Sequence, residues 1–196
     1  MMATITRKSL MSLEEYAAKR NDFRTQVMAH KHNRKVHLGE HVTLLFEDEL
    51  TIRYQIQEML RAERIFEEAG IVDELEAYNP LVPDGSNWKA TMLIEYPDET
   101  ERKNALAKLI NIEDKVWIQV AGQPKVFAIA DEDLERETAD KTSSVHFLRF
   151  ELTAAMKDGL KRGGALAMGI DHQAYRAVVG KVPEAVRQSL INDLAL

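Results

Sequence analysis

Basic and acidic side chains are segregated in the first half of this chain. Residues 19–37 hold six lysines and arginines against one acid, whereas residues 47–76 hold ten acids against three arginines. A pocket for an anionic ligand could form between these stretches, because the planar guanidinium group suits carboxylate and phosphate groups. The candidate ligand-binding residues are Arg20, Arg24, Arg34, Gln55, Glu58, Glu63 and Tyr78.

In this hypothesis the arginines hold the anion and Gln55 orients it, while Glu58 or Glu63 restrains a guanidinium or acts as a base. The alternative is purely structural. Arg20 or Arg24 would then pair with Glu63 only to set the register of two helices, because an unpaired buried charge costs about 3–5 kcal/mol.

The histidines offer a different kind of site, since four of the six lie within residues 30–41. On a regular strand His37 and His41 share one face but lie about 13 Å apart, so only a turn or bulge between them would let both bind one ion. Glu47 or Glu58 would complete a His and carboxylate set of the kind that Fe, Mn or Zn accepts. The alternative is that these histidines lie on a surface strand or at a helix end.

Several kinds of chemistry are excluded or weakened by missing motifs. The chain has no cysteine, so it can hold neither a Cys-ligated iron-sulfur cluster nor a Cys-ligated zinc. It also lacks the common glycine-rich phosphate loops, the Gly-x-Ser-x-Gly elbow and the His-Glu-x-x-His zinc motif. His146, in an apolar stretch, is typical of a satisfied core histidine, and Asp171 and His172 have no nucleophile nearby with which to form a triad.

Length and charge set the class of protein. A chain of 196 residues is expected to form one domain or two small ones, and it contains no run of 18 apolar residues. The net charge of -6 argues against a nucleic-acid binder or a membrane-surface protein. We therefore expect a cytoplasmic protein that binds neither nucleic acid nor membrane.

The hydrophobic spacing predicts which elements position these residues. A helix over residues 13–33 begins with a capping box formed by Ser12 and Glu15, and a strand over residues 36–47 is kinked at Gly39. A second helix follows over residues 49–68, with Gly70 as a left-handed cap and a short helix over residues 71–78. The later elements are strands over 88–96, 115–121, 125–130, 144–152 and 165–170, and helices over 98–110, 153–161 and 183–194, with a helix or loop over 131–141.

This order predicts an α+β fold. An N-terminal helix-strand-helix unit, residues 1–84, would be followed by a mixed sheet with flanking helices, residues 85–196, and the two could pack as a single domain. The second half has the order of a split βαβ, or ferredoxin-like, arrangement, but several topologies share that order.

Several segments resemble one bacterial family, DUF3501. They are residues 34–39, Phe46-Glu47, Thr51, residues 54–61, residues 78–83, Arg149-Phe150 and Asp171-His172. The resemblance brings no known activity. It implies a bacterial cytosolic protein encoded near rubrerythrin-like and iron-sulfur proteins, and therefore a redox or oxidative-stress setting.

Three functions follow as hypotheses. The first is an accessory or ligand-binding protein with an anion pocket. The second is an enzyme or metal carrier that binds Fe, Mn or Zn through His37, His41 and Glu47. The third is a scaffold that docks a redox protein through its acidic surface. Whether the chain is catalytic, and whether it forms a homo-oligomer, stays open at this point.

Overall fold

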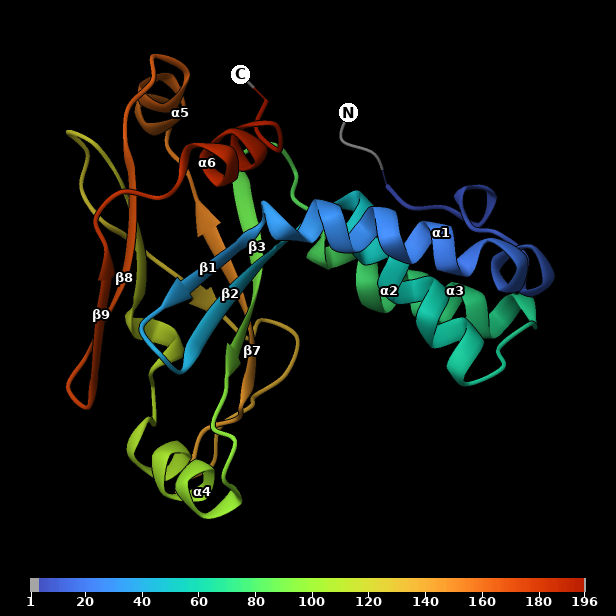
Figure 1. The fold of residues 1–196 in the computed structure, drawn as a ribbon, viewed down its shortest axis with the longest axis horizontal. Helices are drawn as coiled ribbons and strands as arrows, with labels where there is room; N and C mark the ends of the chain where they lie inside the picture. The colour runs from blue at the N-terminus through green and yellow to red at the C-terminus, as the bar shows by residue number, and fades with distance from the viewer. Residues whose placement is uncertain (1–3, 196) are drawn as a thin grey trace.

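A layer of three helices projects from one side of a two-sheet β unit (Figure 1). The structure is a computed structural model and describes residues 4–195. The helices are α1 (Leu13–His32), α2 (Glu49–Ala62), α3 (Glu68–Tyr78), α4 (Glu99–Lys108), α5 (Ala154–Lys161) and α6 (Glu184–Ile191), with single 3-10 turns η1 (Arg7–Ser9), η2 (Asn79–Leu81) and η3 (Glu113–Lys115). No helix within residues 4–195 combines the length and the apolar composition of a membrane span.

The strands form two antiparallel sheets, so the expected α+β class is confirmed. They are β1 (Lys35–Leu38), β2 (Val42–Glu47), β3 (Asn87–Ile94), β4 (Val116–Val120), β5 (Val126–Phe127), β6 (Ile129–Ala130), β7 (Val145–Glu151), β8 (Leu166–His172) and β9 (Tyr175–Val179). The first sheet has the order β1-β2-β3-β7-β6 and the second β5-β4-β8-β9. Every strand pair in these residues is antiparallel, so the expectation of a mixed sheet is wrong. The strands of residues 85–196 are divided between the two sheets, so the expected ferredoxin-like arrangement, which has a single sheet, is wrong as well.

The two sheets bury one continuous apolar core between them. Alternate residues of β3 and β7 point into it, among them Trp88, which is fully buried, and Phe150. The residues between them point to the opposite, outer face of the five-stranded sheet. That face lies beside the helical layer and carries the half-buried side chains of Leu45, Thr91 and Phe147.

The chain turns at Gly39, where one kinked strand was expected. Its φ of +76° lies in the left-handed region that glycine adopts without strain. The turn makes β1 and β2 a hairpin, in which Leu38 pairs with Val42. The Tyr175 hydroxyl of β9 donates to the Leu38 carbonyl at 2.6 Å and accepts from the His41 N–H at 3.1 Å, so the second sheet holds the hairpin tip.

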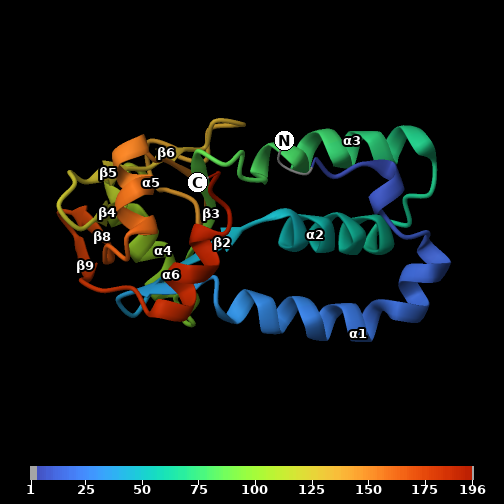
Figure 2. The same cartoon turned by 90° about the horizontal axis from the view of Figure 1, so that it is seen from above.

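The helical layer contains α2 between α1 and α3 (Figure 2). Ser12 caps α1 as expected, because its hydroxyl accepts from the Glu15 N–H at 3.2 Å. The expected capping box is incomplete, since the Glu15 carboxylate accepts from Lys19 at 2.7 Å instead. The break after α2 comes at Arg64, which has a φ of +56°, and not at Gly70. Gly70 lies inside α3, where a Cβ would come within 2.7 Å of Ile65. The apolar faces of α2 and α3 are buried against each other, and this packing explains why the second helix ends near Arg64 and not at Gly70.

Pairing between β2 and β3 crosses the expected domain boundary at residues 84 and 85, because it joins Val42 to Ile94 and Glu47 to Lys89. The first strands therefore belong to the sheet of the second unit. Residues 131–144 form neither helix nor strand, and β9 is an additional strand that the sequence pattern did not indicate.

Candidate functional site

A cavity of about 220 Å³ lies where α1, α2 and η2 meet the outer face of the five-stranded sheet. Strand alternation brings Leu45, Glu47, Thr91 and Phe147 to this face, and the helices close the space above it. The remaining lining residues are Lys31, Thr51, Ile52, Gln55, Tyr78 and Leu81. This is the junction of first helix, strand and second helix at which the sequence placed a ligand site.

Glu47 presents a carboxylate that two threonines hold in place. Its Oε1 accepts from the Thr91 hydroxyl at 2.7 Å and its Oε2 accepts from the Thr51 hydroxyl at 2.6 Å. Thr51 is itself fixed at the start of α2, where its N–H donates to the N-cap side chain of Asp48 at 2.9 Å. Both oxygens of Glu47 are therefore oriented before any ligand binds.

Two further polar groups at the cavity have no partner. Within residues 4–195 neither the Gln55 amide nor the Tyr78 hydroxyl makes a hydrogen bond, and both side chains are half-buried. Lys31 lies over the ring of Tyr54, 5.7 Å from its centroid. Donors and acceptors that converge on a small apolar-walled space are typical of ligand pockets.

A second cavity of about 270 Å³ adjoins the first, since Leu81 and Phe147 line both. The other lining residues are Pro80, Lys89, Glu132, Asp133, Leu148 and Arg149. The Arg149 guanidinium already binds two carboxylates: Glu132, through two contacts of 2.7 Å, and Glu151. Its charge is thus compensated within the chain.

Lys89 has no comparable ion pair, although the carboxylates of Glu132, Asp84 and Glu151 lie near enough to favour its charge. It is half-buried and forms no ion pair with any residue in the described range 4–195. Burial lowers the pKa of Lys89 and the nearby Arg149 cation lowers it further, and the surrounding carboxylates offset only part of this lowering. An acidic group delivered by a ligand would relieve both effects, so Lys89 is the natural anchor for an anion.

Comparison with known proteins gives a family without an assigned function. The model of a family described as "Protein of unknown function (DUF3501)" matches residues 4–194. This chain belongs to that family. A crystal structure of a Burkholderia pseudomallei K96243 protein of unknown function, at 1.90 Å resolution, is 56% identical and has a TM-score of 0.94, with 98% of this chain and 100% of the other covered. No curated protein matches the chain.

Segments that carry the family resemblance border the two cavities. Glu47, Thr51, Gln55 and Tyr78 line the first cavity, and Arg149 lines the second. The sequence stretches around them are up to about one hundred residues apart, and only the fold brings them to one place. Lys89 was not among the ligand-binding candidates predicted from the sequence. The only signal that could have indicated it is a lysine placed between the apolar residues Trp88 and Ala90 in a predicted strand.

The seven residues proposed as one ligand site occupy separate places. Gln55 and Tyr78 line the first cavity, whereas Arg24 and Glu63 are exposed. Arg20 pairs with Glu58, with both contacts at 2.7 Å, so the expected pairing of Arg20 or Arg24 with Glu63 is wrong. Glu63 is the C-cap of α2 and lies beyond the stretch that faces α1.

Arg34 is buried at the junction of the helical layer and the sheets. Its guanidinium donates to Asp193 at 2.5 Å, to the Phe46 carbonyl at 2.9 Å and to the Glu47 carbonyl at 3.0 Å. Asp48 lies 3.4 Å from the same guanidinium. The Arg34 guanidinium is therefore occupied by partners within the chain, and Arg34 does not line the cavity.

The residues proposed as metal ligands do not come together. The His37 ring lies 3.1 Å from the Thr43 hydroxyl, the His41 ring stacks on Tyr96 at 3.9 Å, and Glu47 faces the cavity. His37, His41 and Glu47 do not form a group whose ligand atoms could share an ion. His37 lies in β1 and His41 lies in the turn before β2, so the turn at Gly39 does not place the two rings side by side.

The Arg20–Glu58 pair makes a prediction about pH. Arg20, with the Tyr16 hydroxyl donating at 2.6 Å, lowers the pKa of Glu58 to about 2. Because the folded value lies below the unfolded one, the stabilisation is present above about pH 4.5 and is lost as the pH falls towards 2. Solvent reaches about a quarter of both side chains, so we expect about 1 kcal/mol.

The measurement is chemical unfolding of the wild type and of Glu58→Gln at pH 7 and at pH 3. The variant should be less stable than the wild type at pH 7, and the difference should shrink at pH 3. Glu63→Gln, at the exposed end of the same helix, is the control and should follow the wild type at both values. A gap that stayed constant with pH would contradict the assignment.

Proposed function

We propose that this protein binds a small ligand with an apolar body and one anionic group in the two adjoining cavities. The observation that carries the proposal is Lys89, a half-buried cation without an ion-pair partner at the wall of an apolar-lined space. Together the two cavities reach the size range of small-molecule pockets, roughly 300–1,000 Å³.

The two cavities would hold different parts of the ligand. The anionic group would bind Lys89, because Arg149 is already occupied by Glu132 and Glu151. The apolar body would lie against Leu81 and Phe147, which both cavities share. A polar end reaching the first cavity would meet the Glu47 carboxylate, the Gln55 amide and the Tyr78 hydroxyl. These three groups would select ligands by hydrogen bonding, since leaving them unpaired beside a bound ligand is costly.

A suitable probe is 8-anilinonaphthalene-1-sulfonate, which has an apolar aromatic body and one sulfonate. We expect it to bind the wild type with a fluorescence increase, and decanoate to displace it much better than the uncharged decanol. Lys89→Met should weaken binding by roughly 10–100-fold, which corresponds to the loss of one charge-assisted hydrogen bond. Lys89→Arg should retain most of the affinity.

Lys181→Met is the matched control, because Lys181 is exposed and lines neither cavity. It should bind the probe as the wild type does. Equal affinities of wild type and Lys89→Met, or displacement by decanol as effective as by decanoate, would contradict an anion site at Lys89.

A further inference from the structure

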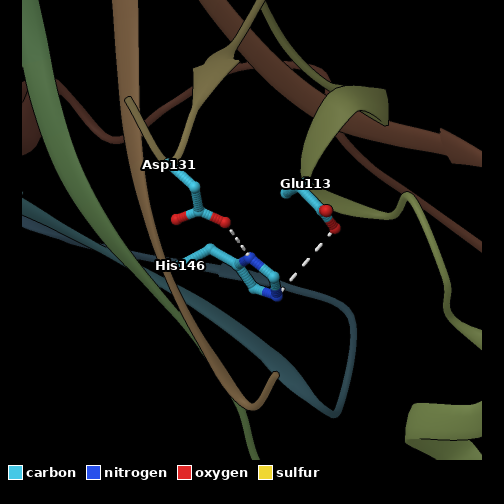
Figure 3. Close-up of side chains that lie close together, drawn as sticks. All are labelled: Glu113, Asp131 and His146. Atoms are coloured by element: carbon cyan, nitrogen blue, oxygen red, sulfur yellow. Dashed lines mark hydrogen bonds and ion pairs between the residues drawn. The ribbon is translucent and has the colours of Figure 1, made fainter. Parts of the chain in front are cut away.

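His146, Asp131 and Glu113 come together from three separate segments (Figure 3). His146 lies on β7, Asp131 follows β6, and Glu113 begins η3. They are the only group of at least three His, Asp and Glu residues within 4–195 whose ligand atoms are close enough to share an ion. None of the three lines the cavities of the proposed function, but the concavity that Glu113 and Asp131 line shares Glu132 and Asp133 with the second cavity.

The two nitrogens of the His146 ring have different surroundings. Nδ1 lies 2.6 Å from Asp131 Oδ2, whose partner oxygen accepts from the Phe147 N–H at 2.9 Å. Nε2 points to three oxygens: the Thr142 hydroxyl and the Ser143 carbonyl, both at 3.0 Å, and Glu113 Oε2 at 3.9 Å. A carboxylate on one nitrogen of a buried imidazole, with oxygen donors around the other, is the arrangement found around metal-ligating histidines.

Glu113 is buried without a strong partner for its side chain. Only 10% of the side chain is exposed, and besides its own backbone N–H its donors are the Thr142 hydroxyl at 3.5 Å and His146 at 3.9 Å. The two side-chain contacts are too long for strong hydrogen bonds, so burial still outweighs the groups that favour the charged carboxylate and raises its pKa. The carboxylate points towards the His146 ring, into the space that a cation would occupy (Figure 3).

The separations between the donor atoms suit an ion at their centre. Donors about 2.1 Å from an ion lie roughly 3.0–3.5 Å from one another in tetrahedral or octahedral geometry. Nε2 lies 3.0 Å from both the Thr142 hydroxyl and the Ser143 carbonyl and 3.9 Å from Glu113, and the Thr142 hydroxyl lies 3.5 Å from Glu113. A small movement of the Glu113 side chain would complete the set.

Access for a cation is also present. Glu113 and Asp131 line a surface concavity of about 450 Å³, and five more carboxylates line it with them: Asp114, Glu132, Asp133, Glu135 and Glu137. Arg136 is the only basic residue among the lining residues, and it is paired with Asp133 at 2.5 Å. Such a field raises the local concentration of cations at the opening.

We propose that His146 Nε2, the Glu113 carboxylate, the Thr142 hydroxyl and the Ser143 carbonyl bind one divalent first-row transition-metal ion, with Asp131 orienting the imidazole. Oxygen donors suit Mn²⁺ and an imidazole suits Fe²⁺ and Zn²⁺, so Mn²⁺ and Zn²⁺ are the probes. The site uses none of the histidines near the chain's first strands.

The test is calorimetric titration of chelator-stripped full-length protein with Mn²⁺ and with Zn²⁺, together with metal analysis after dialysis. The wild type should take up one ion and its unfolding temperature should rise with metal. Glu113→Gln should weaken binding by roughly 10–100-fold, and His146→Asn should abolish it. Glu135→Gln, at an exposed carboxylate of the same concavity, is the control and should bind as the wild type does.

The stability of the metal-free wild type and of metal-free Glu113→Gln distinguishes a metal site from a purely structural ion pair between Glu113 and His146. If Glu113 only balanced a charged His146, Glu113→Gln would be less stable than the wild type, and metal would stabilise neither. In our proposal the metal-free variant is at least as stable as the metal-free wild type, because an uncompensated buried charge has been removed. Equal uptake by wild type and Glu113→Gln, or no uptake by the wild type at about 1 mM free metal, would overturn the site.

Discussion

Replacing Arg34 with methionine is expected to lower the free energy of unfolding by about 3–5 kcal/mol. Arg34 is 1% exposed and joins the end of α1 to β2 and to the end of α6. Methionine fills a similar volume but removes the donor from Asp193 and from three backbone carbonyls, those of Phe46, Glu47 and Ser189. The loss should be measured by denaturant unfolding at pH 7.

Asp193 makes the origin of this effect testable. Burial raises its pKa to about 6, even though the Arg34 cation acts in the opposite direction. The carboxyl is therefore costly to bury, and without Arg34 the cost is uncompensated. Adding Asp193→Asn to Arg34→Met should restore part of the lost stability, so the double variant is expected to lose less than the sum of the two single variants.

Arg24→Met is the control, because Arg24 is exposed on α1, the helix that ends just before Arg34. It should change the free energy of unfolding by less than about 0.5 kcal/mol. A loss of under about 1 kcal/mol for Arg34→Met would contradict the importance of this network. So would strict additivity of Arg34→Met and Asp193→Asn, because the two side chains would then act independently.

The Gly169→Ala variant is expected to lose about 3 kcal/mol, at the upper end of the cost of overpacking. Gly169 lies in the middle of β8, paired with Trp117 of β4 on one side and Val178 of β9 on the other. A Cβ here would come within 2.6 Å of the Ala177 carbonyl oxygen and closer still to the Trp117 ring. Backbone on one side and a buried indole on the other leave the added methyl no direction in which to relax.

Gly122→Ala and Gly180→Ala are controls that distinguish a steric clash of the added Cβ from the effect that replacing any glycine has on stability. A Cβ at either position would meet no atom within 4 Å, but Gly122 has a φ of +76°, so only Gly180 is free of backbone strain. Gly180→Ala should therefore keep wild-type stability, and Gly122→Ala should show the smaller cost of strain. If Gly169→Ala unfolded like Gly180→Ala, the close packing at β8 would be contradicted.

Local patterns in the sequence determined most of the elements. Helical spacing together with the Ser12 cap predicted α1, and alternation predicted β3 and β7 within a few residues. The segregation of charge predicted that α1 and α2 pack together, and this is confirmed by the Arg20–Glu58 pair. The helix and the strands depend on residues two to four positions apart, and the charge segregation is a matter of composition, so a single sequence contains all of these features.

The partner of Arg20 shows where local patterns stop. Glu58 and Glu63 both lie on or beside the second helix, but five residues at 100° each place them about 140° apart around its axis. Only the docking of α1 on α2 decides which of them faces the arginine. The predicted metal site of His37 and His41 failed for the same reason, because sequence spacing does not show which side chains the turn at Gly39 brings together.

The candidate sites were decided by the tertiary structure. Lys89 lacks a partner because β7 brings Arg149 beside it while Glu132 and Glu151 bind that arginine instead. Sequence by itself determined the elements, the α+β class and the absence of thiol chemistry. Which side chains converge is set by contacts between residues far apart in the chain, and their geometry is fixed only when the sheets and helices pack.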